Sequence, residues 1–456
     1  MSNVLDLVDY AFFRVERATG LTSVIQCVWV YDRMVDLEGL SRFHRHLRRG
    51  RLSRRIERSP LPFGRHRWVQ PNGPRDLGIV ESPRQRDEFD AWLDEQANTR
   101  LDAERGPGWH LAVLPFTDGG SAVSLVASHC LTDAVGLSEA VADAIRGDDN
   151  AINWPAAASR PRWRALYEDA RQSARDIPDI ARAAAAAARF VQRHRETVGS
   201  AVTTPAARPA PLADAAENVT PPTATIFVDA DEWDARAQAL GGTSNTLFLA
   251  LAARLAQRVG RVTADGSVSL TMAINERTAG DTRANAITNV DFTVDPAPAT
   301  TDLRPIRATT KQALIRSRTE PDERWTLLPL ALLVPERLGR RWLGAAANNA
   351  ASVGSSNVGA IDPAVNRPDG TDADQFAMRS LSPGITNGVM HQLGGLLSLL
   401  SGRVNGRVFV SIVAYQLDAR NSNEILQQDI SSSLHELALT PIMGWRCHES
   451  TGAVPG

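Results

Sequence analysis

Residues 128–133 read Ser-His-Cys-Leu-Thr-Asp and lie where the predicted secondary structure changes from strand to helix. The run before them, residues 121–128, has the alternating apolar pattern of a β-strand. Residues 134–146 carry apolar side chains at helical spacing, which predicts a helix. Rigid elements commonly present functional side chains at such junctions. The histidine and the aspartate of this stretch are therefore the first candidates for a functional site.

His129 is suited to proton transfer. Its neighbours are small and uncharged, so its imidazole can stay neutral near pH 7, as a general base requires. Asp133 could orient His129 or fix the turn; the alternative is that His129 ends a strand and Asp133 caps a helix. Adjacent strand residues point to opposite faces, so Cys130 is not expected to act as a nucleophile with His129. The spacing alone does not decide between these interpretations.

Composition narrows the class of protein. A chain of 456 residues exceeds one compact core and predicts two domains. A net charge of −2 lacks the signature of a nucleic-acid-binding protein. The three cysteines are far apart and show no zinc-type spacing, which favours a reducing compartment without a metal site. Neither a signal peptide nor a membrane-spanning run is evident. We therefore expect a cytoplasmic protein that contacts a membrane, if at all, at its surface.

The organisation of the chain predicts two α/β units. Helix and strand patterns alternate in both halves, which is typical of α/β layers. The Pro-, Ala- and Thr-rich residues 199–223 predict a linker between residues 1–198 and residues 224–456. Within the first unit, residues 163–196 are strongly helical, and Pro178 predicts a break in that helix.

Several segments, taken in order with residues 128–133, resemble one family. That family is the bacterial wax ester synthase/diacylglycerol acyltransferases, within the superfamily of coenzyme-A-dependent acyltransferases and condensation domains. The resembling segments are Asp-Tyr-Ala-Phe-Phe at 9–13, Arg-Leu-Asp to Pro-Gly-Trp at 100–109, Gly-Thr-Ser-Asn-Thr at 242–246, Asn-Glu-Arg at 275–277, Thr-Asn-Val at 288–290 and Ser-Ser-Asn-Val-Gly at 355–359.

The chain departs from the family pattern at the motif itself. The family has His-His-x-x-x-Asp-Gly, whereas here Ser128 replaces the first histidine and Ala134 replaces the glycine. His129 stands where the family has its base. Residues 356–361 also lack the prolines of the family's Ser-Asn-Val-Pro-Gly-Pro. The resemblance is thus to a divergent member.

The resemblance implies a fold and a mechanism. Two chloramphenicol-acetyltransferase-like α/β subdomains would form a V, with a central channel and His129 near its middle. His129 would take the proton from the acceptor as it attacks an acyl thioester, without an acyl-enzyme. Asp133 would act structurally, in an ion pair with Arg277, since a buried carboxylate needs a partner. Asn289 would lie near the developing oxyanion; the alternative is a strand-end residue that satisfies its own backbone. The residues expected along the channel are Ser128, Ala134, Gly136, Asn245, Ser356 and Asn357.

The resemblance also implies substrates and partners. The first hypothesis is transfer from acyl-CoA, a substrate rather than a bound cofactor, to a fatty alcohol, diacylglycerol, or a glycolipid or polyketide hydroxyl. A second is a condensation-like enzyme of natural-product biosynthesis, with the acyl group on an acyl carrier protein. A third is a non-catalytic condensation-like binding module. A lipid acceptor would make peripheral contact with a membrane or lipid droplet useful.

A basic segment, residues 42–67, holds ten arginines and one glutamate. Its charge could attract the phosphates of coenzyme A, the acidic surface of a carrier protein or anionic lipid headgroups. The alternative is a solvated surface that uses arginine for solubility.

Overall fold

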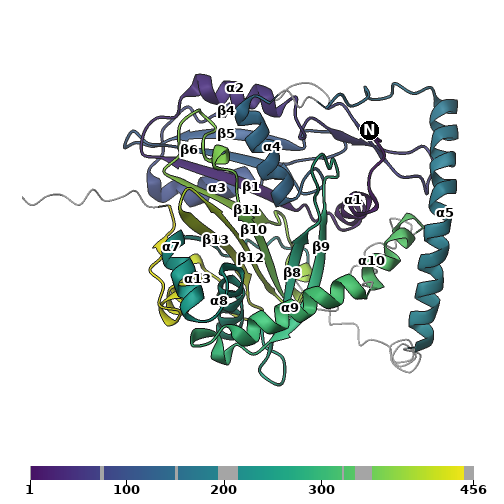
Figure 1. The fold of residues 1–456 in the computed structure, drawn as a ribbon. Helices are drawn as coiled ribbons and strands as arrows, with labels where there is room; N and C mark the ends of the chain where they lie inside the picture. Colours follow the sequence, from purple (N-terminus) through teal and green to yellow (C-terminus); the bar gives the residue numbers. More distant parts are fainter. Residues whose placement is uncertain are drawn as a thin grey trace, which may run out of the picture.

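Two mixed sheets form the centre of the protein (Figure 1). The computed structural model describes residues 2–71, 76–148, 152–193, 214–320, 323–333 and 352–445. The predicted α/β class with two sheet-containing subdomains is confirmed. Residues 199–213 of the predicted linker lie outside the described residues, so the division at this segment stays a prediction.

The first sheet has five strands in the order β11-β1-β6-β5-β4. Both faces of β1 are covered, because its odd-numbered residues pack with α2 and α4 while Val28 and Val30 pack with α3. The elements of this layer are β1 (Val24–Tyr31), β4 (Gly78–Ile79), β5 (Trp109–Pro115), β6 (Ser121–Ser128), α2 (Leu37–Leu47), η1 (Arg86–Glu88), α3 (Phe89–Ala97) and α4 (Ala134–Arg146), with the separate ribbon β2 (Arg55–Glu57) and β3 (Arg67–Val69).

The second sheet has seven strands in the order β14-β7-β13-β12-β10-β8-β9. Its central helix α8 is apolar almost all round and is buried along most of its length. Thr243 caps α8, because its Oγ1 accepts a hydrogen bond from the backbone N–H of Thr246 at 3.3 Å. The strands are β7 (Thr223–Asp229), β8 (Val268–Asn275), β9 (Ile287–Val294), β10 (Val353–Ala360), β12 (Leu396–Val404), β13 (Arg407–Tyr415) and β14 (Ile442–Met443). The helices are α7 (Ala230–Ala239), α8 (Ser244–Arg258), η2 (Ala297–Thr300), α9 (Arg304–Thr319), η4 (Pro363–Asn366), α12 (Asn387–Gln392) and α13 (Asn423–Glu436).

One strand crosses between the two halves of the chain. β11 (Gln375–Leu381) follows most of the second sheet in sequence, yet it pairs antiparallel with β1, with Met378 opposite Cys27. Without β11, the apolar strand β1 would be an unpaired edge, which natural sheets avoid. The first sheet is therefore completed by residues that the sequence pattern places in the unit 224–456.

Four helical elements lie together at one side of the sheets: α1 (Leu7–Thr19), α5 (Arg162–Arg193), α10 (Glu323–Leu327) and η3 (Leu328–Leu332). The predicted break at Pro178 is wrong, because α5 runs through this residue. Proline removes one backbone hydrogen bond, and at this exposed position water can satisfy the freed carbonyl. Among the described helices, none has both the length and the apolar character needed to cross a membrane.

Candidate active site

His129 follows β6 and faces a cavity between the two sheets. Its backbone N–H donates to the carbonyl of Ser23 at 2.9 Å, which fixes the start of the turn. Phe12 of α1 stacks on the imidazole, with ring centroids 5.0 Å apart and an interplanar angle of 6°. The ring is therefore held on one face by a neighbouring aromatic side chain.

Asn285 determines which nitrogen of His129 carries the proton. Its amide nitrogen Nδ2 donates to the carbonyl oxygen of His129 at 3.1 Å and to Oδ1 of Asp9 at 3.2 Å. These acceptors fix the orientation of the amide, so that Oδ1 of Asn285 faces Nδ1 of His129 at 2.9 Å. An amide oxygen can only accept, so Nδ1 holds the proton. Nε2 then keeps its lone pair, which is the state that a general base needs.

Asp9 holds the loop that carries Asn285. The backbone N–H groups of Ala284 and Asn285 donate to its two carboxylate oxygens at 2.9 and 2.7 Å. Burial raises the pKa of Asp9 to about 6, while the charge of Arg54 opposes this rise. Asp9, Phe12 and Asn285 were not assigned to the site from the sequence. The spacing of Asp9 and Phe12 places both on one face of α1, but no sequence signal singles out Asn285.

Burial also affects the charge of His129. It lowers the pKa of the imidazole below its usual value, although the carboxylate of Asp133 acts in the opposite direction. A lowered pKa favours the neutral ring near pH 7. Burial thus favours the neutral ring, and the hydrogen bond that Nδ1 donates to Asn285 fixes which nitrogen of that ring carries the proton.

Asp133 and Arg277 lie together, and both side chains are almost completely buried. Nη2 of Arg277 donates to Oδ2 of Asp133 at 2.8 Å, and the backbone N–H of Ala286 donates to the same oxygen at 2.8 Å. Oδ1 of Asp133 accepts from the N–H of Gly136 at 2.6 Å and so caps α4. Asp133 therefore joins the turn after His129 to the loop of Asn285, and the interpretation of Asp133 as a helix cap also holds.

The cavity beside His129 has a volume of about 70 Å³ and a mostly apolar wall. Of the residues expected along the channel, Ala134, Ser356 and Asn357 line it. Asn357 is fixed by its neighbours, because its Nδ2 donates to Oδ1 of Asn245 at 3.0 Å. The other lining residues are Ile25, Asp133, Val135, Ala273, Ile274, Asn275, Ile287, Val358, Ser380 and Leu400.

The remaining expected channel residues lie outside the wall of this cavity. The hydroxyl of Ser128 accepts from the N–H of Cys130 at 3.2 Å, beneath the turn. Gly136 lies under the ion pair, where a Cβ would come within 2.8 Å of Nη2 of Arg277. Asn245 reaches the cavity only through Asn357. These three residues support the shape of the site from outside the wall of this cavity.

Asn289 does not lie with His129. It lines a second, open cavity of about 830 Å³ between the β8–β9 pair and α9. This cavity shares Ile274, Asn275 and Ile287 with the smaller one. The polar residues that line the cavity beside His129 are instead Asp133, Asn275, Ser356, Asn357 and Ser380. The hypothesis that Asn289 contacts an oxyanion has no support from its position.

Cys130 is turned away from His129. Its thiol donates to Oε2 of Glu16 at 3.4 Å. Burial and this carboxylate raise the pKa of the thiol well above its usual value, so the thiolate needed for nucleophilic attack is disfavoured. Among the described residues, no group of three His, Cys, Asp or Glu side chains is placed to hold a metal ion.

Several arginines of the basic segment are paired or buried inside the protein. Arg67 pairs with Asp169 at 2.7 Å, and Arg65 pairs with Asp176 at 3.4 Å. Arg54 is buried, and its Nη2 donates to the carbonyl of Leu131 at 2.7 Å. These arginines hold α5 and the turn after His129 in place, so the charge available to a phosphate or a carrier protein is smaller than the sequence suggests.

No model of a known protein family matches the sequence, and no curated protein matches it. Solved structures do match. The first condensation domain of the CDA synthetase matches with a TM-score of 0.58 and 15% identity, over 97% of this chain and 99% of that one. The chain has the fold of a condensation domain.

Two acyltransferases share this condensation fold. The wax ester synthase/diacylglycerol acyltransferase from Marinobacter aquaeolei VT8 matches with a TM-score of 0.52 and 16% identity, over 95% of this chain and 98% of that one. The TRI3 trichothecene 15-O-acetyltransferase from Fusarium sporotrichioides matches with a TM-score of 0.57 and 10% identity, over 95% and 94%. At these identities, the likeness establishes the condensation fold across nearly the whole chain.

Proposed function

We propose that this protein is an acyltransferase in which His129 is the general base. Nε2 of His129 takes the proton from an acceptor hydroxyl as its oxygen attacks the carbonyl carbon of an acyl thioester. The carbon–sulfur bond then breaks, and the leaving thiolate receives the proton from His129. The observation that carries the proposal is the hydrogen bond from Nδ1 of His129 to Asn285, which leaves Nε2 unprotonated at the cavity.

The wall around His129 supports an apolar substrate group. Ile25, Ile274, Ile287 and Leu400 line the cavity together with smaller apolar side chains. The cavity of about 70 Å³ holds only the reacting atoms and a few neighbours, whereas the adjoining cavity of about 830 Å³, which charged residues such as Arg316 and Glu320 line together with apolar ones, has room for a larger substrate group. This arrangement favours an apolar acyl group, for which we propose acyl-CoA as donor, and a fatty alcohol, diacylglycerol, or glycolipid or polyketide alcohol as acceptor.

A carrier-protein-bound acyl donor is the competing candidate. It is favoured by the full-length match to the condensation domain of a peptide antibiotic synthetase. Both donors present the same thioester carbonyl to His129, and they differ only in what lies beyond the pantetheine arm. The chemistry at His129 is therefore the same for both, and the donor is a question for experiment.

The test is release of free thiol by the purified protein. Acyl-CoA and acyl carrier protein are each supplied with a long-chain alcohol, a diacylglycerol or a primary amine. We expect His129→Ala to abolish thiol release, and Cys130→Ala, the adjacent matched control, to retain it. Retention of activity by His129→Ala would refute the general-base mechanism. Absence of thiol release by the wild-type protein with every pair would instead favour a binding module.

A further inference from the structure

Helix α5 lies at the edge of the molecule and contacts the rest of it along one face (Figure 1). The buried residues of the helix are Ala165, Asp169, Asp176 and Ala183, which recur at helical spacing. Two of them are held by ion pairs with Arg67 and Arg65. The side of α5 that faces the body is thus defined, and the opposite side faces solvent.

Much of the solvent-facing side of α5 is apolar. Trp163 is 72% exposed, Tyr167 64% and Ile177 60%. At about 100° per residue, a sector roughly 120° wide, whose centre lies about 145° around the helix from the mean direction of the buried residues, contains only apolar side chains from 163 to 188. We call this sector the outer apolar stripe. Its members, all exposed, are Trp163, Leu166, Tyr167, Ala170, Ala174, Ile177, Pro178, Ala181, Ala184, Ala185 and Ala188.

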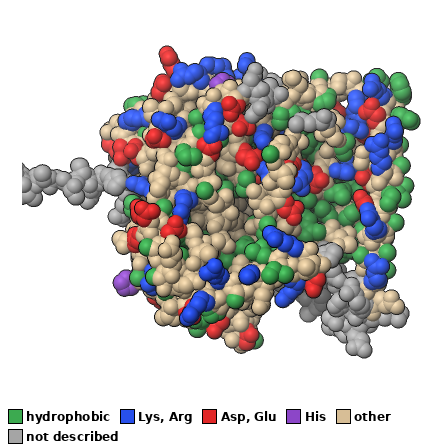
Figure 2. Space-filling view, viewed as in Figure 1, with side chains coloured by type: hydrophobic (Ala, Val, Ile, Leu, Met, Phe, Trp, Pro, Cys, Tyr) green, Lys and Arg blue, Asp and Glu red, His purple; other side chains and the backbone are tan. Residues whose placement is uncertain are grey.

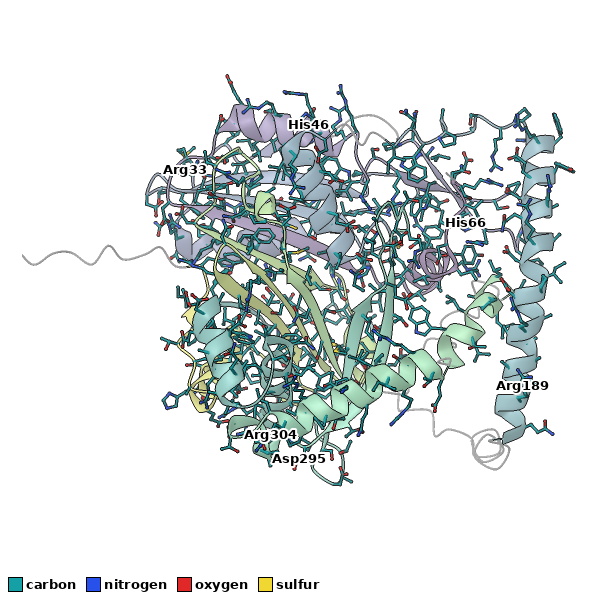
Figure 3. All side chains as sticks on the ribbon, viewed as in Figure 1. Arg33, His46, His66, Arg189, Asp295 and Arg304 are labelled. Carbon is teal, nitrogen blue, oxygen red and sulfur yellow. The ribbon has the colours of Figure 1, made fainter. Side chains whose placement is uncertain are left out.

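A row of arginines runs along one border of the outer apolar stripe. On the same helical projection, they lie between about 80° and 120° from the centre of the stripe. The row consists of Arg164, Arg171, Arg175, Arg182 and Arg189. Figure 2 shows apolar side chains along the outer margin of this helix with basic side chains beside them, and Figure 3 places Arg189 on α5, far from the sheets. Among the described residues, no carboxylate forms an ion pair with Arg171 or Arg175.

We propose that α5 binds the surface of an anionic lipid membrane. The outer apolar stripe would enter the boundary between headgroups and acyl chains, and the arginine row would contact lipid phosphates. Interfacial helices have this composition: an apolar face with aromatic residues beside a basic border. Tryptophan and tyrosine are favoured at the membrane interface because each has an apolar body and a polar tip. The proposal does not depend on the proposed acyltransferase activity.

A membrane fits the outer apolar stripe better than a protein partner does. Beyond Pro178 the stripe consists of alanine alone, and alanine offers little side-chain area for the interlocking contacts of a helix–helix interface. Lipid needs no matching side chains, only an apolar face and a favourable charge. The arginine row supplies that charge toward phosphate.

The experiment measures binding of the full-length protein to vesicles. Flotation with phosphatidylcholine vesicles is compared with vesicles that contain about one quarter phosphatidylglycerol. We expect wild-type protein to bind the anionic vesicles, and Leu166→Asp/Ile177→Asp to bind them about tenfold or more weakly. Arg171→Glu/Arg175→Glu should weaken binding to anionic vesicles by on the order of tenfold or more. The matched controls are Met34→Asp/Ile315→Asp and Arg304→Glu/Arg367→Glu, which change exposed residues elsewhere and should bind as wild type.

An environment-sensitive dye attached to α5 distinguishes a membrane from other partners that would cover the outer apolar stripe. Cys27 and Cys130 are buried, so Tyr167→Cys/Cys447→Ser carries one accessible thiol for an environment-sensitive dye. A blue shift on addition of anionic vesicles, lost at high salt, is expected. An apolar dye environment without vesicles would show that the chain itself covers the stripe. Light scattering that shows a dimer converted to monomer by Leu166→Asp/Ile177→Asp would identify a second copy. Either result, or vesicle binding unaffected by the α5 variants, would overturn the proposal.

Discussion

Oδ1 of Asn285 lies 2.9 Å from Nδ1 of His129, although the two residues are separated by 156 positions in the sequence. The rest of the Asn285 amide is held by the backbone of His129 and by Asp9. The state of the imidazole therefore depends on a loop from the other half of the chain.

Asn285→Ala should slow turnover while leaving substrate binding nearly unchanged, because the protein would lose the group that keeps the proton on Nδ1. We expect kcat to fall about ten- to a hundredfold, part of the roughly 10²- to 10⁴-fold that a positioned general base contributes. KM should change little. Asn289→Ala is the matched control, since this asparagine lines the other cavity. A larger loss of kcat in Asn289→Ala than in Asn285→Ala would contradict the assignment.

The value of kcat/KM should fall only at acidic pH. The reaction requires neutral His129, so kcat/KM falls as the pH decreases through the pKa of this residue. Burial lowers that pKa from its usual 6.5, so the acidic limb should lie below pH 6.5 and the rate should already be level near pH 7. The measurement is kcat/KM as a function of pH with a saturating donor. An acidic limb above pH 7 would show that His129 is not the neutral base described here.

Removing one partner of the Asp133–Arg277 pair should destabilise the protein as well as inactivate it. Asp133→Ala would leave Arg277 buried without its carboxylate, and breaking a buried pair in this way typically costs about 3–5 kcal/mol. Thermal or urea unfolding measures the change. The double variant Asp133→Leu/Arg277→Met should be more stable than Asp133→Ala, because neither charge remains.

Glu95→Ala is the control for this pair, since Glu95 forms an exposed ion pair with Arg84. Exposed pairs contribute little to stability, so its unfolding should resemble that of wild type. Equal effects of Asp133→Ala and Glu95→Ala would show that the buried pair is not a structural element of the site.

Gly136→Ala should destabilise α4 at its first turn. A Cβ at this position would come within 2.8 Å of Nη2 of Arg277 and 2.9 Å of Oγ1 of Thr132. Overpacking of this kind costs about 1–3 kcal/mol, and the displaced Arg277 should reduce activity too. Gly50→Ala is the control, because its Cβ would meet only the carbonyl of His46 at 3.6 Å. Unfolding midpoints and initial rates of the two variants test this, and a wild-type midpoint for Gly136→Ala would exclude the clash.

The parts of the site that depend on neighbouring residues could be predicted from the sequence. Alternation in residues 121–128 and helical spacing in residues 134–146 are local patterns, and the structure has β6 and α4 at those positions. The association of Asp133 with Arg277 followed from the family resemblance, because a buried carboxylate needs a cation wherever the fold is kept.

The parts that depend on how distant loops meet could not be predicted. Asn285 belongs to no periodic element, and its place is set by the carboxylate of Asp9. Asn289 lies two residues beyond Ile287 along β9, about 7 Å along the strand at roughly 3.3 Å per residue, and it lines the larger cavity instead of the cavity beside His129. A sequence motif identifies a strand of this kind but does not fix which of its residues reaches the cavity.

The pairing of β1 with β11 has a consequence for the synthesis of the protein. Residues 375–381, the partner of β1, are made about 350 residues after β1, since Met378 pairs with Cys27. At about 5–20 residues per second, the interval on the ribosome is on the order of tens of seconds. Throughout that time an apolar strand edge is available to other nascent chains. The first sheet therefore stays incomplete until β11 has been made, and chaperones that shield the edge of β1 during this interval should favour its correct pairing.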